Sequence, residues 1–392
     1  MLDTQHDVAQ TAKEMEKIVG GRSVALVHDF LLSPGGAERV LEMFSALFPR
    51  APIYTILYDP DGMKGMFAGR DIHPSFLQKM PRVVRRRHRF LLPLFPTAPE
   101  TFDLRDYDIV ISSSGAWSKG IVTRLNTFHI AYIHSPMRFV WDYNERYARE
   151  ARGKEPGIFL RAILSYVRVW DRQAADRPDV LIANSRYTQQ RIAKYYRRES
   201  SVLYPPIADA ANDGVSLQEK KYFLVVSRLS PYKNVALAMD VCNKLELPLV
   251  VVGEGREYAK LRRHAGKTVR MVGWQDAKSL ARFYAGARAV LFPAEDDFGM
   301  VAAEALAHGV PVIAVRRGGV TEIVQEGVTG EFFDVPVAEV CADALRRFIE
   351  KEGSYDQVAM RAAAGKFSRE RFAHSFAAIL SDALSSQSTN TL

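Results

Sequence analysis

Residues 290–329 read VLFPAEDDFGMVAAEALAHGVPVIAVRRGGVTEIVQEGVT, and this stretch decides the fold. An apolar run at residues 289–292 predicts a buried strand, and a polar loop follows it. Residues 300–308 predict a helix, which a glycine ends because glycine suits the left-handed backbone of a helix cap. A second apolar run, residues 311–315, predicts the next strand. Strand, loop, helix and strand in this order are the unit of a parallel α/β sheet.

Two acids of this stretch lie where a parallel sheet binds ligands. Asp296 lies in the polar loop, and Glu304 follows eight residues later on the predicted helix. The glycine pair Gly318 and Gly319 comes after the second strand. Ligands of such sheets bind at the loops that leave the carboxyl ends of the strands. The stretch therefore predicts a ligand site as well as a fold.

A related pattern occurs earlier in the chain. The apolar run 222–226 predicts another strand, and the loop SRLSPYKN after it carries Arg228 and Lys233. Together with the segment DDFGMVAAEALAHGVPVIA and the glycine pair, this loop resembles the signature of the family 4 retaining glycosyltransferases, E-x(7)-E with a preceding Arg and Lys. The resemblance covers residues 24–372. It is nearest to the bacterial mannosyltransferases of surface-polysaccharide assembly, although Asp296 stands where the family has glutamate.

The resemblance implies the GT-B fold. In that α/β fold two Rossmann-like, doubly wound domains face each other across a cleft, and a C-terminal helix crosses back to the first domain. The boundaries expected here are a mobile or helical extension at 1–20, an acceptor-binding domain at 21–204, a nucleotide-sugar-binding domain at 205–366, and the crossing helix with a disordered tail at 367–392. The length of 392 residues suits two domains.

Arg228 and Lys233 are the expected clamp for the donor's diphosphate. A sugar nucleotide leaves as a diphosphate whose outer oxygen gains charge, so fixed cations aimed at it lower the barrier. Such a pair takes the place of the divalent metal that other transferases use. No D-x-D triad and no His/Cys cluster with ligand spacing stands out in the sequence. We therefore expect no metal and no cofactor, only a sugar nucleotide as substrate. Solvated surface charges are the alternative interpretation of this pair.

The resemblance also assigns the residues around the second acid. Glu304 would accept hydrogen bonds from a ribose diol, and Asp296 would contact the sugar's hydroxyl groups. Aspartate is shorter than glutamate by about 1.5 Å, one C–C bond. The loop would have to move inward, Glu295 would have to substitute, or the contact would weaken. Backbone N–H groups at the start of the helix would face the sugar and phosphate; they belong to Phe298, Gly299, Met300 and Val301.

The first half of the chain carries two further candidates. Gly35 and Gly36 follow a predicted strand and open a helix, a turn that can aim N–H groups at an anion or can be a plain strand-to-helix turn. The family has a glycine pair here, beside the donor diphosphate and acceptor. His134 ends another predicted strand. A lone histidine is more often structural, but the family has a matching histidine that orients the sugar.

Charge is spread unevenly along the chain. The formal net charge is +8, and all of this excess lies in residues 1–204. The run from Lys79 to Arg89 is rich in arginine, and Phe90, Leu91 and Leu92 follow it. Cations beside apolar residues predict contact with an anionic membrane surface. A nucleic-acid site has no accompanying motif and is not expected, whereas an ordinary solvated helix face remains an alternative.

The remaining features predict a cytoplasmic protein peripheral to the inner face of the membrane. No apolar run approaches the roughly 20 residues that span a bilayer. The polar N-terminus is not a secretory signal, and Cys242 and Cys341 lie in apolar helical contexts typical of buried free thiols.

The predicted function is retaining transfer of a hexose, most readily mannose from GDP-mannose, to a lipid-linked oligosaccharide in bacterial polysaccharide biosynthesis. Two alternatives remain. One is a transferase that uses a UDP-sugar (glucose, galactose or N-acetylglucosamine), and the other is a non-catalytic protein of the same fold that binds sugar nucleotides or glycans.

Overall fold

The computed structural model describes residues 2–86, 88–142, 157–208 and 220–390. The chain divides into two compact units. The N-terminal unit consists of Leu2–Pro206 together with Phe372–Leu392, and the C-terminal unit is Ile207–Arg371. The chain thus leaves the N-terminal unit once and returns to it for its last helix. The expected boundary, between residues 204 and 205, lies two residues before the observed one.

The N-terminal unit is built on a seven-stranded sheet whose strands all pair in parallel. The strand order is β3-β2-β1-β4-β5-β6-β7. Central strands such as β4 and β5 are buried along their whole length, as expected for apolar runs covered on both faces. The strands are β1 (Val24–Leu31), β2 (Ile53–Tyr58), β3 (Ile72–Pro74), β4 (Ile109–Ser114), β5 (Phe128–Ile133), β6 (Val180–Ala183) and β7 (Ser201–Val202).

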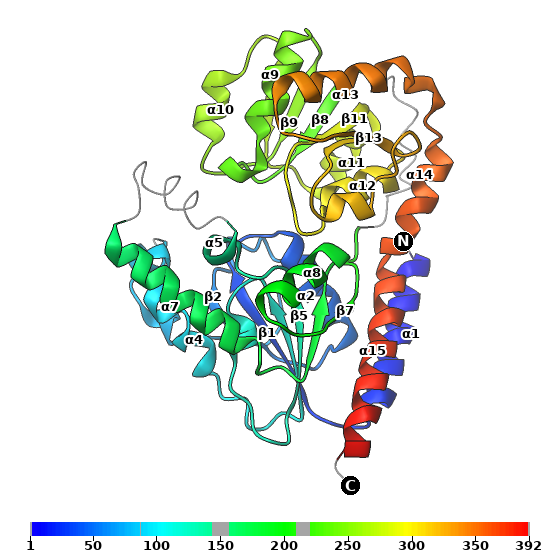
Figure 1. Ribbon diagram of the computed structural model, residues 1–392. Coiled ribbons are helices and arrows are strands. Elements are labelled where there is room, and N and C mark those ends of the chain that lie inside the picture. Colours follow the sequence, from blue (N-terminus) through cyan, green and yellow to red (C-terminus); the bar gives the residue numbers. More distant parts are fainter. Residues whose placement is uncertain (1, 87, 143–156, 209–219, 391–392) are drawn as a thin grey trace. The chain divides into compact units, whose positions relative to one another are not determined.

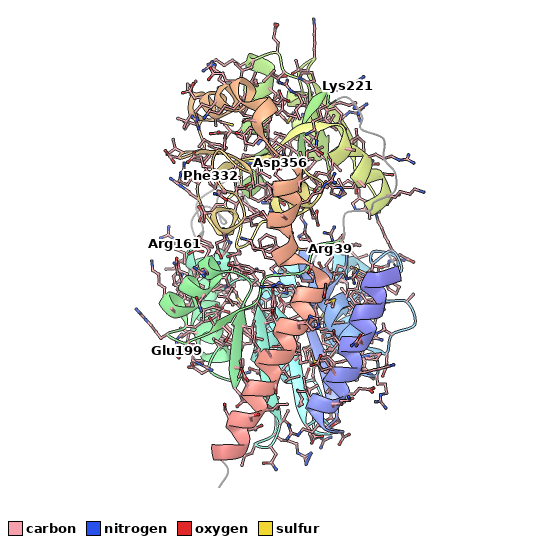
Figure 2. All side chains as sticks on the ribbon, turned by 90° about the vertical axis from the view of Figure 1, so that its right-hand side faces the viewer. Arg39, Arg161, Glu199, Lys221, Phe332 and Asp356 are labelled. Atoms are coloured by element: carbon pink, nitrogen blue, oxygen red, sulfur yellow. The ribbon has the colours of Figure 1, made fainter. Side chains whose placement is uncertain are left out.

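Helices cover this sheet, and they include the two ends of the chain. In Figures 1 and 2 the first helix, α1, lies beside the last one, α15. Phe44 contacts both Phe372 and Phe376 with ring centroids 5.5 and 4.9 Å apart, so α15 completes the core of this unit. The helices are α1 (Leu2–Val19), α2 (Gly36–Leu47), α3 (Arg82–Arg86), α4 (Thr97–Glu100), α5 (Arg138–Trp141), α7 (Ile158–Ala174), α8 (Arg186–Tyr195) and α15 (Arg369–Asn390).

The C-terminal unit has a six-stranded parallel sheet in the order β10-β9-β8-β11-β12-β13. Its strands are β8 (Tyr222–Val226), β9 (Leu249–Val252), β10 (Val269–Gly273), β11 (Ala287–Phe292), β12 (Val312–Val315) and β13 (Gly330–Phe333). Its helices are α9 (Val235–Lys244), α10 (Tyr258–His264), α11 (Ala277–Ala285), α12 (Met300–Ala307), α13 (Ala338–Glu350) and α14 (Gln357–Ala364). The two doubly wound units confirm the predicted fold class.

Both ends of the described chain are helical, which was one of the two expectations for the N-terminal extension but not the expectation for the C-terminal tail. The N-terminal extension is helix α1, and its Met15 and Val19 are buried against the core of the unit. The polar tail expected to be disordered continues α15 as far as Asn390, and Leu384 packs in the same core. Cys242 and Cys341 are buried and unbridged, as predicted. No helix in the described parts of the chain is long and apolar enough to cross a membrane.

Candidate functional site

The candidate donor residues lie where the strand order of the C-terminal sheet reverses. Strands β8 and β11 are neighbours in the sheet but far apart in sequence. The strands that follow β8 lie on one side of this pair, and those that follow β11 lie on the other. The crevice outside the carboxyl ends of two such strands is the usual ligand site of this kind of sheet. Arg228 and Lys233 follow β8, and Asp296 follows β11. The fold thus brings two separate motifs to one edge.

Lys233 and Asp296 form an ion pair across this crevice. The Lys233 ammonium group donates to Oδ2 of Asp296, and their side chains are only 17% and 18% exposed. Burial lowers the pKa of Lys233, but the Asp296 carboxylate outweighs it, so the pKa is raised overall. Arg228 is exposed, and its charge acts in the opposite direction. The sequence analysis gave Lys233 and Asp296 separate ligands and did not predict that they pair.

The glycine pair fixes the backbone of the Asp296 loop. The N–H of Gly319 donates to the carbonyl oxygen of Asp296 at 2.9 Å. Gly318 has φ +78°, and a Cβ there would lie 2.3 Å from that same oxygen. A Cβ on Gly319 would lie 2.3 Å from the carbonyl oxygen of Asp297. Both contacts are closer than any side chain permits, so only glycine lets these two loops meet.

The start of α12 carries the predicted backbone donors. Gly299 has φ +101° and precedes Met300, the first residue of the helix. The N–H groups of Met300 and Val301 belong to the first turn, which has no preceding turn to accept from them. The ring of Phe298 is buried and contacts Phe367 edge-on, with centroids 5.1 Å apart. The buried side chain of Phe298 therefore holds the loop against Phe367.

Glu304 is buried, and a partner that the sequence analysis missed holds it. Its side chain is 5% exposed, and Oε2 accepts a hydrogen bond from the Tyr284 hydroxyl at 3.3 Å. Tyr284 lies on α11, and its ring stacks on His308 with centroids 4.8 Å apart. Burial, with a smaller effect of the Arg361 charge, lowers the pKa of His308 to about 4. Nothing in the local sequence of α11 marks Tyr284, because the contact spans 20 residues.

The N-terminal sheet also reverses its strand order, between β1 and β4. Asp29, near the end of β1, is buried, and its carboxylate accepts four backbone N–H groups at 2.6–2.9 Å. The donors are the consecutive residues after β4: Gly115, Ala116, Trp117 and Ser118. This clamp shapes the loop at the crevice. Asp29 was not among the predicted site residues, because nothing in the local sequence indicates its four donors.

His134 lies at the same edge, directly after β5. Its Nε2 is 2.8 Å from the Ser113 hydroxyl, and its ring meets that of Tyr132 edge-on. Asn184 donates to the His134 carbonyl oxygen at 2.9 Å, which holds the backbone. The His28 ring is 6.4 Å away, centroid to centroid. His134 is thus a positioned, partly exposed imidazole beside the Asp29 clamp.

Gly35 and Gly36 lie at the start of α2. Gly35 caps this helix with an extended backbone, φ −161° and ψ −169°, and Gly36 is its first residue. Glu38, in the first turn, approaches Nε2 of His28 to 3.7 Å. The backbone N–H groups at the start of α2 therefore belong to Gly35 and Gly36, near the buried His28 and Glu38.

Each unit thus presents polar groups suited to anions and hydroxyl groups. Lys233, Arg228 and the N-terminus of α12 supply positive potential in the C-terminal unit. His134 and the α2 N-terminus lie at the corresponding edge of the N-terminal unit. Within the described residues, no group of three or more His, Cys, Asp or Glu side chains could hold a metal ion.

Two family matches divide the chain at the same place as the structure. Residues 34–210 match the family described as Glycosyltransferase Family 4, and residues 209–371 match Glycosyl transferases group 1. Both matches are to glycosyltransferase families, and each covers less than half of the chain. The structure of the Anabaena protein HepE in complex with UDP-glucose superposes with a TM-score of 0.67 at 18% identity. It covers 92% of this chain and 99% of that one, which shows the shared fold.

The named relatives align with only part of this chain and with only part of their own length. The D-inositol 3-phosphate glycosyltransferase of a Nocardioides species is 27% identical over 294 residues, which are 64% of this chain and 62% of the relative. The lipopolysaccharide 1,2-N-acetylglucosaminetransferase of Salmonella typhimurium is 31% identical over 173 residues, 39% of this chain and 45% of the relative. The chain therefore spans less than two thirds of either relative.

Proposed function

We propose that the protein is a retaining, metal-independent glycosyltransferase that moves a hexose from a sugar nucleotide to a glycan acceptor. The observation that carries this proposal is the Lys233–Asp296 pair at the reversal point of the C-terminal sheet, with Arg228 on the same loop and α12 behind it. A diphosphate needs cations and N–H donors at one place, and a sugar needs carboxylates beside them. The two family matches support the same reaction class.

Each residue has a distinct part in the proposed reaction. Arg228 and Lys233 bind the diphosphate and stabilise the charge that grows on the outer phosphate oxygen as the C–O bond breaks. Glu304 holds the ribose, and Asp296 stabilises the oxocarbenium-like sugar without attacking it. The departing phosphate accepts the proton of the acceptor hydroxyl, which attacks from the same face. His134 orients the sugar, and its contact with Ser113 limits rotation of the ring.

We propose GDP-mannose as the donor, because of the resemblance to mannosyltransferases of polysaccharide assembly. A UDP-sugar is the second candidate. It is favoured by the UDP-glucose complex of the structurally similar HepE protein and by the N-acetylglucosaminetransferase relative. The proposed acceptor is a lipid-linked oligosaccharide, which the protein would meet at the inner face of the cytoplasmic membrane.

The experiment is a donor screen followed by a variant. Thermal shift with each common sugar nucleotide should identify the donor, because a ligand stabilises by RT ln(1 + [L]/Kd). Donor hydrolysis and transfer are then measured with Lys233→Ala. Loss of this charge should raise the barrier by about 2–4 kcal/mol. Unchanged kcat/KM in Lys233→Ala would reject the clamp. Binding without hydrolysis or transfer for every donor would favour a non-catalytic binding protein.

A further inference from the structure

Helix α7 of the N-terminal unit has two apolar faces, and within the described residues only one of them packs in the core. The inner face packs in the core of the unit through Leu164, Val167 and Trp170. The same core contains Leu77, Leu91 and Phe95, which come from the basic stretch around Lys79–Arg89. Trp117 joins the two, because its ring contacts Phe95 of the stretch and Trp170 of α7 with centroids 5.4 Å apart in both cases.

The apolar part of the basic stretch is only partly exposed: Val83 and Leu94 are 69% and 39% exposed, whereas two leucines between them are covered. Leu91 is 6% exposed and belongs to the core, and Leu92 is partly buried against it. The expectation that Phe90, Leu91 and Leu92 contact lipid is therefore wrong for Leu91, because the sheet needs its side chain as cover. Arg87 and the side chains of residues 86–90, which include Phe90, lie outside the described part of the structure.

The outer face of α7 exposes large apolar side chains instead. Ile158, Phe159, Tyr166 and Val169 are 88%, 78%, 55% and 58% exposed. Ile158, Tyr166 and Val169 recur at helical spacing, so they share one side of the helix, opposite the buried Val167. Exposed apolar residues are normal when single, but a row along one helix marks an interaction surface.

Positive charge borders this row. Arg161 is an exposed neighbour of it on α7 and is labelled in Figure 2, and Lys79 and Arg82 are exposed on the adjacent stretch. The only acid within α7 and residues 79–94 is Asp171. Asp171 is fully buried, where Lys119 neutralises it. One further acid lies at the edge of this surface, because Oδ2 of Asp61 is 4.0 Å from the Arg82 guanidinium group. The surface therefore presents apolar side chains with more cations than acids.

We propose that the outer face of α7 docks on an anionic lipid bilayer, with Ile158, Phe159 and Val169 in the acyl region and the cations at the headgroups. Tyrosine suits the boundary between the two regions, as Tyr166 would require. A second copy of this chain fits less well, because a two-fold contact would bring the arginines of one copy against those of the other. The inference rests on the proposed function, since a lipid-linked acceptor requires a docked enzyme.

The test is binding to vesicles of phosphatidylcholine with and without phosphatidylglycerol. Wild type should bind the anionic vesicles, and the double variant Ile158→Asp, Phe159→Asp should bind at least about tenfold more weakly, since each large apolar side chain contributes a comparable factor. Val358→Asp is the matched control, because Val358 is 72% exposed on α14 of the other unit. Arg82→Glu with Arg161→Glu should weaken binding most at low salt.

A tryptophan variant tests how deeply the outer face of α7 enters the bilayer. Phe159→Trp should gain fluorescence on anionic vesicles and should be quenched by lipids brominated in the acyl chain. Equal vesicle binding by wild type and the double Asp variant would overturn the proposal. A wild type that forms dimers, while the double variant is monomeric and neither binds vesicles, would assign the face to a second copy instead. Donor hydrolysis should be unchanged in the double variant. Loss of vesicle binding with intact hydrolysis separates this inference from the proposed function.

Discussion

Replacing Asp296 by asparagine should move nucleotide binding and turnover in opposite directions. In the structure the Asp296 carboxylate holds the ammonium group of Lys233. A diphosphate must compete with this carboxylate for the same cation. Asp296→Asn removes the competing charge and keeps the size of the side chain, so nucleoside diphosphates should bind more tightly. Turnover should fall, because the same carboxylate is proposed to stabilise the positive sugar.

The size of the binding effect follows from the burial of the pair. Two unit charges about 4 Å apart attract by about 4 kcal/mol at an effective dielectric of about 20. Removing both groups from water cancels much of this attraction, and exposed pairs retain only about 0–1 kcal/mol. With side chains 17% and 18% exposed, the pair lies near the buried end of that range. We expect about 1–2 kcal/mol, or five- to thirtyfold tighter binding.

Calorimetry with GDP and UDP at fixed ionic strength measures this change, and steady-state transfer measures turnover. Asp297→Asn is the control, because it makes the same change in net charge one residue away. A further check is Lys233→Ala with Asp296→Asn, in which the gain in affinity should disappear. Weaker diphosphate binding in Asp296→Asn would refute the reasoning and would mean that Asp296 orients Lys233 toward the phosphate.

Three further predictions concern metal, the Asp29 clamp and pH. Activity should survive excess EDTA, and loss that Mg²⁺ or Mn²⁺ restores would contradict the cation clamp. Asp29→Asn should lower the free energy of unfolding by at least about 2 kcal/mol, because four N–H groups lose a charged acceptor, whereas Asp61→Asn, at a side chain 92% exposed, should change little in urea unfolding. Burial, the larger cause, and a nearby arginine charge lower the pKa of His129 to about 3 and that of His308 to about 4. In the unfolded chain both histidines have a pKa of about 6.5, so the free energy of unfolding should be greatest above that pH. It should fall as the pH drops toward 4, by up to about 1.4 kcal/mol per pH unit for each histidine. His308→Phe should flatten this slope in urea titrations between pH 7 and 5.

The sequence predicted what local patterns encode. An apolar run located the strand Tyr222–Val226 with the bounds that the structure has, because a parallel strand covered on both faces is typically a near-continuous apolar run. Spacing around a strand end also marked Lys233 and Asp296. Their pairing needed the order of the strands, which places β8 beside β11.

Contacts between segments that are far apart in the sequence could not be predicted for the same reason. Asp29 meets its four N–H donors across more than 85 residues, and Glu304 meets Tyr284 from another helix. Only the fold determines such contacts, since no local period or motif records them. The buried position of Leu91 was missed for a similar cause. A basic, apolar run looks alike whether its leucines cover a sheet or face a membrane, and the core partner on α7 decides between them.

The return of the chain to the N-terminal unit has a consequence for synthesis. Residues 207–371 are contiguous and can fold as soon as they leave the ribosome, whereas the earlier unit still lacks Phe372 and Phe376. At about 5–20 residues per second, that unit waits on the order of tens of seconds with the α1 and α2 side of its core uncovered. The unit that begins first is therefore finished last. A stop codon placed at residue 372 would release a chain with one complete unit and one whose exposed core attracts chaperones.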